Sequence, residues 1–172
     1  MQNFDQAILT LKKVININPD HFEAYNNIGA ALQAQGKLEE AASAFKNVLK
    51  IKPDLVEGYN NLAIALKDQG KVEEAVATYE KAISLNPNDV QTSTNLAILL
   101  FESKKFEEAE TFMRRALELM PNDPIVNDHY GDVLWKNGNS LQARYYWNYV
   151  LNLDETEEDL KQIVKNKLLS GL

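Results

Sequence analysis

Asparagine recurs in this chain at a spacing that suits recognition of a polypeptide backbone. Asn27, Asn61 and Asn95 are 34 residues apart. A carboxamide offers both a donor and an acceptor, so it can pair with both halves of a peptide bond whatever side chain is attached. Packed helices lie roughly 8–10 Å apart and an extended chain rises ~3.3 Å per residue, so one asparagine per repeat would meet about every third ligand residue. The column predicts a ladder that holds an extended peptide.

The same column has a second interpretation, which the sequence leaves open. Amides that are partly buried need hydrogen-bond partners in any case, and neighbouring backbone groups could supply them. In that case the asparagines would be part of the scaffold and would not contact a ligand. The fourth position of the column is His129, which breaks the series.

The elements that carry these residues repeat with the same period. A fixed period of this length predicts a stacked-repeat architecture, in which each repeat is one supersecondary unit. Proline and alanine both follow it, at Pro19, Pro53, Pro87 and Pro121, and at Ala7, Ala41, Ala75, Ala109 and Ala143.

Each period contains two helical patterns separated by a short turn. In the copy that begins at residue 22, Tyr25, Ile28 and Leu32 recur at the spacing of one helical face. Gly36 follows, where a helix end needs a backbone conformation that glycine adopts at little cost. Pro53 ends the second helix. The period therefore predicts helix-turn-helix units.

These residues resemble the tetratricopeptide repeat. That family shows a large residue, a Leu-Gly pair and a second large residue, followed by a small residue, an aromatic residue and a proline. The copy quoted above reads Tyr25, Ile28-Gly29, Leu32, Ala41, Phe45 and Pro53. The resemblance implies an all-α, right-handed α-solenoid in a single domain over residues 1–172. The expected parts are a half repeat at 1–21, full repeats at 22–55, 56–89, 90–123 and 124–155, and a capping helix at 156–172.

The later copies depart from the pattern. Lys104 stands where the turn glycine is expected, and Ser93 and Asn127 replace the large aromatic residue. We expect these places to be locally weaker or reshaped. Thr156 is expected to cap the last helix, and the acidic residues 154–159 suit the positive end of a helix better than a calcium loop.

In this family the first helix of each repeat lines a concave groove, so the resemblance implies a scaffold for protein–protein interaction that binds an extended peptide or partner segment. The repeats of O-linked N-acetylglucosamine transferases carry a similar asparagine ladder. Phe101 and Trp135 would accept an apolar ligand side chain, or would pack between repeats. The expected groove residues are Asn26, Asn27, Asn60, Asn61, Ile64, Lys67, Asn95, Ile98, Phe101, His129, Asp132 and Trp135.

The first 21 residues match only the second helix of a repeat. Its apolar residues Phe4, Ile8, Leu11 and Ile15 have no polar replacement for the missing first helix, whereas natural arrays end in polar caps. We therefore expect a fragment of a longer array, and the C-terminal residues are similar to those of bacterial tetratricopeptide proteins. The alternative function is self-assembly through this open face, as a two-fold homodimer.

Composition argues against other classes of function. The net charge is −7, with no basic stripe for nucleic acid, no apolar run for membrane insertion and no cysteine. The two histidines fall in different copies, and no glycine-rich phosphate loop is present. We expect no metal, no cofactor and no enzymatic activity, unless a catalytic domain lies outside this sequence. The sequence leaves the compartment open between the cytoplasm and, if the parent chain carries an export signal, the periplasm.

Overall fold

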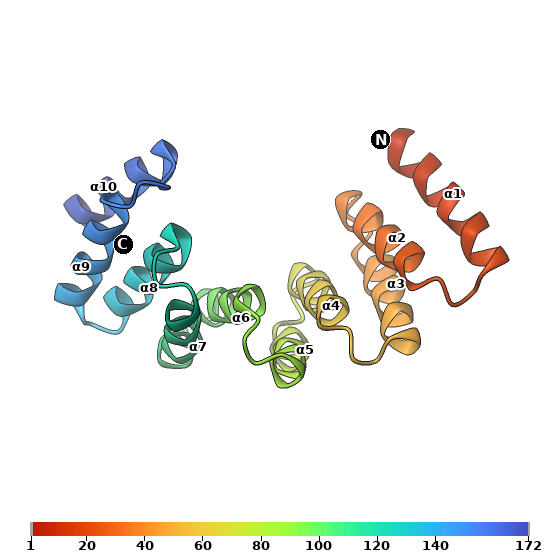
Figure 1. The fold of residues 1–172 in the computed structure, drawn as a ribbon, viewed down its shortest axis with the longest axis horizontal. Coiled ribbons are helices and arrows are strands. Elements are labelled where there is room, and N and C mark those ends of the chain that lie inside the picture. Colours follow the sequence, from red (N-terminus) through yellow and green to blue (C-terminus); the bar gives the residue numbers. More distant parts are fainter. Residues whose placement is uncertain (1, 172) are drawn as a thin grey trace. The chain divides into compact units, whose positions relative to one another are not determined.

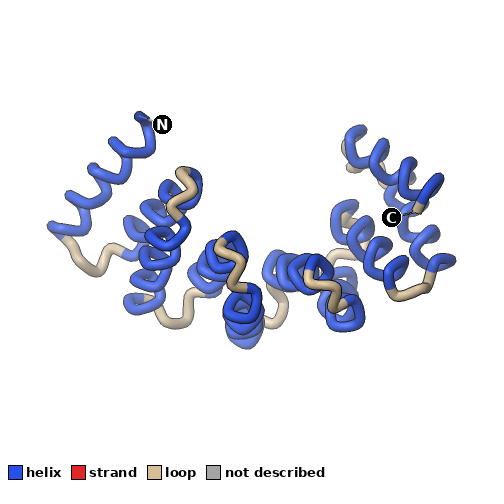
Figure 2. The backbone as a smooth tube through the Cα atoms, turned by 180° about the vertical axis from the view of Figure 1, so that it is seen from behind, coloured by secondary structure: helices blue, strands red, loops and turns tan. Residues whose placement is uncertain are grey.

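The structure of the chain, a computed structural model, describes residues 2–171, with side-chain exposure from residue 4 onward. Within that range every regular element is an α-helix, and short loops join the helices (Figures 1 and 2). The all-α class expected from the sequence is therefore confirmed. The described helices are α1 (Gln2–Ile17), α2 (Phe22–Ala34), α3 (Leu38–Ile51), α4 (Val56–Asp68), α5 (Val72–Leu85), α6 (Val90–Glu102), α7 (Phe106–Leu119), α8 (Pro124–Lys136), α9 (Ser140–Leu151) and α10 (Glu158–Ser170).

The chain divides into two compact units. The N-terminal unit, residues 1–87, contains α1 to α5, and the C-terminal unit, residues 88–172, contains α6 to α10. In the N-terminal unit α2 packs on α3, α4 packs on α5, and α1 lies against α2. In the C-terminal unit α6 packs on α7, α8 packs on α9, and α10 lies against α9. Each unit is thus made of two helix pairs and one further helix. Among the described residues, no helix has the length and apolar character needed to cross a membrane.

The turn inside each helix pair requires a left-handed residue. Lys104 adopts φ 61°, although a side chain in this region costs about 1 kcal/mol or more. The hydrogen bond that closes the turn is nevertheless kept, since Lys105 N donates to the Leu100 carbonyl at 2.8 Å, as Lys37 N does to Leu32 at 2.9 Å. The expectation that Lys104 reshapes this turn is therefore wrong. The equivalent residues of the other turns are Gly36, Gly70 and Gly138, with φ of 74°, 75° and 83°.

The residues that replace the aromatic position in the later copies bind the starts of their own helices. Ser93 Oγ donates to the Asp89 carbonyl at 3.0 Å. Asn127 Nδ2 donates to the carbonyls of Pro121 and Asp123, both at 2.8 Å. Both side chains are buried. Hydrogen bonds at the helix start therefore take the place of aromatic packing at these two positions.

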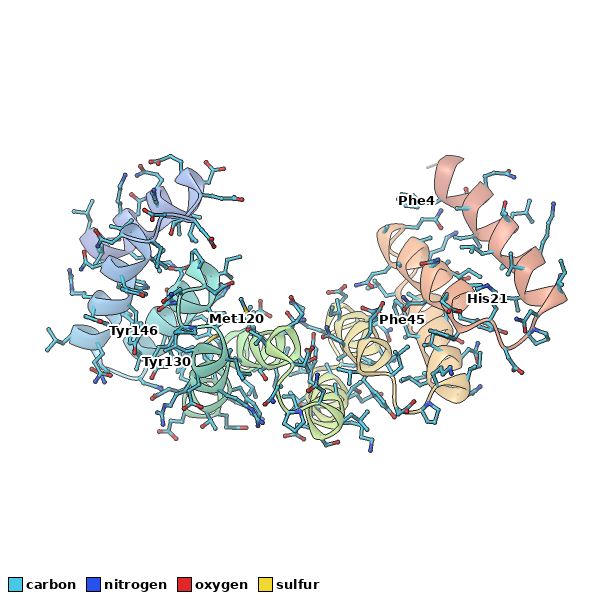
Figure 3. All side chains as sticks on the ribbon, viewed as in Figure 1. Phe4, His21, Phe45, Met120, Tyr130 and Tyr146 are labelled. Atoms are coloured by element: carbon cyan, nitrogen blue, oxygen red, sulfur yellow. The ribbon has the colours of Figure 1, made fainter. Side chains whose placement is uncertain are left out.

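The core of each unit lies between the two helices of a pair. Gly29 faces the ring of Phe45, which Figure 3 marks on α3, and an added Cβ would lie 2.6 Å from that ring. Gly131 faces the Trp147 indole in the same way, at 2.5 Å. Small residues are needed here because the opposing rings fill the space between the helices. The period alanines Ala41, Ala75, Ala109 and Ala143 are all 0% exposed.

Helix α1 does not follow this rule. Its period alanine, Ala7, is exposed, and its Leu11 is half-buried, because no first helix of its own repeat covers them among the described residues. Ile8 is instead buried, so its expected place on an open apolar face is wrong. The residues that α1 does expose are Phe4, Leu9 and Ile17, at 43%, 51% and 87%.

Helix α10 closes the C-terminal unit. Val164 is fully buried, and Leu160 and Leu168 pack beside it against the core of that unit. The helix begins at Glu158 with Glu157 as its N-cap residue. Thr156 does not cap it as expected, because its buried Oγ1 donates to the Val150 carbonyl of α9 at 2.7 Å. The hydroxyl thus fastens the connecting loop to the preceding helix.

Candidate partner-binding site

The amide residues of α2 and α4 hydrogen-bond to one another in the N-terminal unit. Asn61 Nδ2 donates to Asn26 Oδ1 at 2.9 Å, and Asn26 Nδ2 donates to Glu57 Oε1 at 3.0 Å. One turn or more further along, Gln33 Nε2 donates to Asp68 Oδ2 at 2.7 Å. These bonds join side chains more than 30 residues apart in sequence. They therefore link neighbouring first helices through side chains, whereas the scaffold interpretation expected bonds to backbone groups.

The remaining predicted residues on these helices differ in exposure. Asn27 is exposed, whereas Asn60, Ile64 and Lys67 are half-buried. In α6, Asn95 is half-buried and its Oδ1 accepts from Gln91 Nε2 at 3.1 Å, within one turn of the same helix. Some hydrogen-bonding groups of the asparagines at 61 and 95 are thus used inside the chain, and the peptide ladder stays a prediction.

The C-terminal unit holds a pocket where several of the predicted residues converge. Its volume is about 190 Å³. Most of its lining residues are apolar, and the Phe101 ring stands edge-on to Phe106 with ring centroids 5.4 Å apart. Helices α6 and α8 supply most of the lining, and Met113 comes from α7. The lining residues are Ile98, Phe101, Glu102, Met113, His129, Asp132 and Val133.

Beside the pocket, a lysine from α10 is held by two carboxylates of α8. Lys167 Nζ lies 2.8 Å from both Asp128 oxygens and 2.8 Å from Asp132 Oδ2. The three side chains are 12%, 7% and 12% exposed. Trp147 Nε1 also donates to Asp132 Oδ1, at 3.1 Å. Asp132 is therefore the link between the pocket wall, the core tryptophan and the last helix.

The charge of Asp132 is only partly compensated. Burial of the side chain, followed by the charge of Asp128, raises the pKa of Asp132 above its ordinary value, although Lys167 acts in the opposite direction. The side chains of Asp128, His129 and Asp132 also offer atoms of metal-ligand type within 4.8 Å of one another. The Lys167 ammonium contacts both carboxylates of this group, so the chain itself supplies a cation there.

Trp135, expected in the groove, is largely occupied by contacts inside the C-terminal unit. A Cβ added to Gly171 would lie 2.4 Å from its ring, and the Trp147 ring centroid is 5.4 Å away. The Arg144 guanidinium lies 5.8 Å from the Trp135 ring centroid and donates to the Leu168 carbonyl at 2.8 Å. Trp135 thus packs on the second helix of its own repeat and on the C-terminal end of the chain, whereas the alternative interpretation expected packing between repeats.

Sequence reasoning did not select Asp128 or Lys167 for this site. The available signal was the spacing of Asp128 and Asp132, which places two like charges one helical turn apart on a largely apolar helix. Such a pair calls for a nearby cation when it is buried. Nothing in the 34-residue period indicates that Lys167 provides it, because α10 lies outside the repeats.

A second, larger cleft lies in the N-terminal unit on the side of the second helices. Its volume is about 420 Å³, and Lys12, Glu40 and Asn47 are among its polar residues. Residues from α1, α2 and α3 line it, so it depends on the placement of α1. The apolar lining residues are Ile15, Tyr25, Ile28, Leu32 and Ala44.

Tyrosines of α8 and α9 form a further aromatic group. Tyr130 and Tyr146 lie next to each other (Figure 3), with ring centroids 4.8 Å apart in an edge-on arrangement. Tyr145 lies 5.3 Å from Tyr146 and stacks on Tyr149 at 6.4 Å. Tyr145 is 63% exposed, so this group reaches from the core to the surface of α9.

Family models match most of the repeat region. Two models described as "Tetratricopeptide repeat" match residues 20–88 and 66–128, and one described as "TPR repeat" matches residues 1–36. Among curated proteins, the small glutamine-rich tetratricopeptide repeat-containing protein 2 of Saccharomyces cerevisiae is 43% identical over 44 residues. That match covers 26% of this chain and 13% of the yeast protein, so the chain corresponds to a small part of that relative.

Solved structures share the fold over nearly the whole chain. A crystal structure of MamA has a TM-score of 0.80 at 20% identity, with 90% of each chain covered. Pseudomonas aeruginosa PilF has a TM-score of 0.79 at 22% identity, covering 99% of this chain and 82% of its own. YrrB, described as a TPR protein with an unusual peptide-binding site, has a TM-score of 0.75 at 16% identity, covering 96% and 84%. These likenesses confirm the expected solenoid fold.

Proposed function

Because the chain belongs to the tetratricopeptide repeat family, whose members are scaffolds for protein–protein interaction, we propose that it binds an extended segment of a partner protein without catalysing a reaction. The binding surface is the face of the first helices, and its anchor is the pocket between α6 and α8. YrrB, a neighbour in fold, is described as having a peptide-binding site, which is consistent with this role.

The pocket is the observation that carries the proposal. Its volume of about 190 Å³ exceeds the roughly 150 Å³ of an apolar cavity that binds benzene. One aromatic or large branched side chain would therefore fit it. Ile98 and Phe101, which are half-buried, would contact that side chain, and apolar burial supplies roughly 25 cal/mol per Å². A single anchor of this kind supports weak binding, and further contacts along the face would add to it.

The amides of the N-terminal unit have a separate part in the proposal. Asn26 and Asn61 are held in fixed positions by their mutual hydrogen bond. Since an amide oxygen can accept two hydrogen bonds, Asn61 Oδ1 keeps the capacity to accept a backbone N–H of a bound segment. The network thus reduces the freedom that binding would otherwise remove from these side chains.

Methyl NMR on the full chain tests the anchor pocket. The probe is a capped heptapeptide with one central phenylalanine flanked by glutamines. We expect the methyl signals of Ile98 and Met113 to shift with a dissociation constant of about 1 mM, as one buried side chain would give. A peptide with alanine in place of the phenylalanine should cause no shift.

Two variants one repeat apart provide the matched control. Ile98→Glu places a carboxylate in the pocket and should weaken binding of the phenylalanine peptide by about tenfold. Ile64→Glu makes the same change one period earlier, at another half-buried isoleucine outside the pocket, and should leave the affinity unchanged. Equal binding by the wild type and Ile98→Glu would show that the pocket is not the anchor.

Self-assembly through α1 is a second candidate function. The observation that favours it is the exposure of Ala7, whose period equivalents are all fully buried. Phe4 extends the exposed apolar surface, and Leu11 and Ile15 are half-buried beside it. An apolar surface of this kind is typical of a protein–protein contact, and a second copy could cover it with two-fold symmetry.

Sedimentation velocity over a wide concentration range tests this candidate. A dimer should form in the wild type and be lost in Leu11→Lys, whereas Leu141→Lys, a change at an 81% exposed leucine of α9, should still dimerise. A wild-type chain that stays monomeric at the highest concentration would exclude self-assembly through α1.

A further inference from the structure

Helix α10 lies beyond the four full repeats, yet the structure places it next to α8 in the position of a first helix. It has 13 residues, as α8 has, and it begins 34 residues after α8 begins. Lys167 contacts Asp132 across 35 residues, the same offset that separates Asn61 from Asn26 on two neighbouring first helices. Val164 is fully buried, and the equivalent residues of the other first helices are buried too.

One face of α10 is polar, as expected for a helix that closes an array. Lys165 stands at the position equivalent to Gly131, which faces the Trp147 indole of the second helix in the preceding pair. Lys161, one turn earlier, stands at another position that would face a second helix. Charged side chains at these two positions suit an end of the array that is in contact with water.

The face of α10 that corresponds to the binding surface is different. Ile163 stands at the position equivalent to His129, and Leu169 at the position equivalent to Phe101, and both equivalents line the anchor pocket. Ile163 and Leu169 are 51% and 85% exposed, and they are the large apolar residues that the described part of α10 exposes. Asn166 lies one turn from each, so the three residues share one face. The exposed apolar residues of α10 thus lie on the binding side only.

Asp132 joins this apolar pair, Ile163 and Leu169, to the anchor pocket. It lines the pocket, and it also holds Lys167, which lies between the two apolar residues in the sequence of α10. Neighbouring helices lie roughly 8–10 Å apart and an extended chain rises ~3.3 Å per residue, so α10 is reached about four residues from a side chain seated between α6 and α8. A segment that fills the pocket and continues past α8 therefore passes over the apolar pair.

We infer that the partner segment carries two apolar residues about four positions apart, one seated in the anchor pocket and the other against Ile163 and Leu169. This inference rests on the proposed function, because it describes the same bound segment. It gives α10 a part in recognition besides closing the C-terminal unit. It also gives the site a requirement for spacing, whereas the anchor pocket alone would recognise one side chain.

Four capped undecapeptides test the spacing on the full chain. Each consists of glutamines and one phenylalanine, and a leucine stands four residues after the phenylalanine, four residues before it, directly beside it, or is absent. One of the first two peptides, depending on the direction of the bound segment, should bind about five- to tenfold more tightly than the peptide without leucine. That peptide should also shift the methyl signals of Ile163 and Leu169. The peptide with adjacent residues has the same composition and should show no such gain.

Variants on the surface of the C-terminal unit locate the gain. Ile163→Gln and Leu169→Gln should each reduce it and leave the affinity for the peptide without leucine unchanged. Leu141→Gln changes an 81% exposed leucine of α9 and should leave all the affinities unchanged. The three positions are exposed, so none of these changes should disturb the fold.

The outcomes are distinct. Equal binding of the four peptides, with the Ile98 and Met113 methyl signals shifted, would overturn the inference and leave the anchor pocket standing. A gain that survives both glutamine variants of α10, or that the adjacent arrangement shares, would also overturn it. So would an Ile163 signal that moves when the chain alone is diluted, because a second copy would then cover α10. If none of the peptides shifts the Ile98 and Met113 signals, the proposed function itself fails.

Discussion

The two units have the same kind of helix pair but differ on the face of their first helices. In the N-terminal unit, amides and carboxylates such as Asn26 and Glu57 bridge neighbouring helices at positions that are exposed or half-buried. In the C-terminal unit, the same face has an apolar pocket and a buried contact between Lys167 and Asp132. Packing restricts which residues can occupy the buried positions of each helix pair. The positions on the face of the first helices can carry either polar or apolar side chains, so the two units differ there.

The largest expected loss of stability comes from truncating a buried residue of the C-terminal unit, compared with the equivalent repeat position in the N-terminal unit. Trp147 is fully buried in the C-terminal unit, while Leu11, its equivalent four periods earlier, is half-buried on α1. Trp147→Ala should lower the free energy of unfolding by about 3–5 kcal/mol, because it leaves a large cavity. Leu11→Ala should cost about 1 kcal/mol or less, since the position is already partly solvated. Urea denaturation measures both, and equal costs would contradict the difference in burial.

The next effect concerns the buried charges of the C-terminal unit. Lys167→Met leaves Asp128 and Asp132 without their cation and should destabilise the chain by about 3 kcal/mol. Lys165→Met, on the same helix, removes a lysine that is 49% exposed and 3.6 Å from Glu158, and should cost less than about 1 kcal/mol. If both variants lost a similar free energy of unfolding, the buried contact of Lys167 would contribute no more to stability than the exposed ion pair of Lys165.

The amide network of the N-terminal unit should contribute less. Asn61→Ala removes the donor to Asn26 at a half-buried site and should cost about 0.5–1.5 kcal/mol. Asn27→Ala changes an exposed neighbour and should be close to neutral. Thermal unfolding of the two variants checks the assignment, which would be wrong if Asn27→Ala were the more damaging change.

The smallest effect is a dependence on pH. The pKa of Asp132 is raised in the folded chain from an ordinary value of 3.8, so protonation favours the folded state. Its contribution to stability is fully present below the ordinary value and is lost as the pH rises through the raised pKa. Asp132→Asn lacks this titration, so its stability relative to the wild type should increase as the pH rises through that window. Urea denaturation at several pH values measures the difference, and a decrease would contradict the assigned direction.

The core could be predicted because burial follows the period. Ala75 and Ala109 lie where two helices meet, and the 34-residue spacing alone identifies them. The conformation of the turn at Lys104 could not be predicted in the same way. A lysine stands there in place of the usual glycine, yet the backbone keeps the left-handed conformation of the other turns. Hydrogen bonds of the turn and packing of the flanking helices outweigh the cost of one lysine in a left-handed conformation.

Of the residues at the candidate site, only those at equivalent positions of the 34-residue repeat could be predicted from the sequence. Ile98, Phe101, His129 and Asp132 share a helix face by register, and the structure brings them to one pocket. The contact of Asp128 with Lys167 spans 39 residues and involves a helix beyond the four full repeats, so no repeat register indicates it. The pairing of Asn61 with Asn26 depends on side-chain conformations, which a column of identical residues does not specify.

Photo-crosslinking tests the central claim, that the pocket between α6 and α8 receives the apolar side chain of a partner. The probe is the glutamine-flanked heptapeptide of the methyl NMR test with photo-leucine in place of phenylalanine, irradiated with the full chain and mapped by mass spectrometry. The account predicts that adducts concentrate on Ile98 and Phe101, the half-buried apolar residues of the pocket, and are lost when the unlabelled phenylalanine peptide competes. Adducts that fall mainly on α1 or on the tyrosines of α9, or that resist competition, would contradict it.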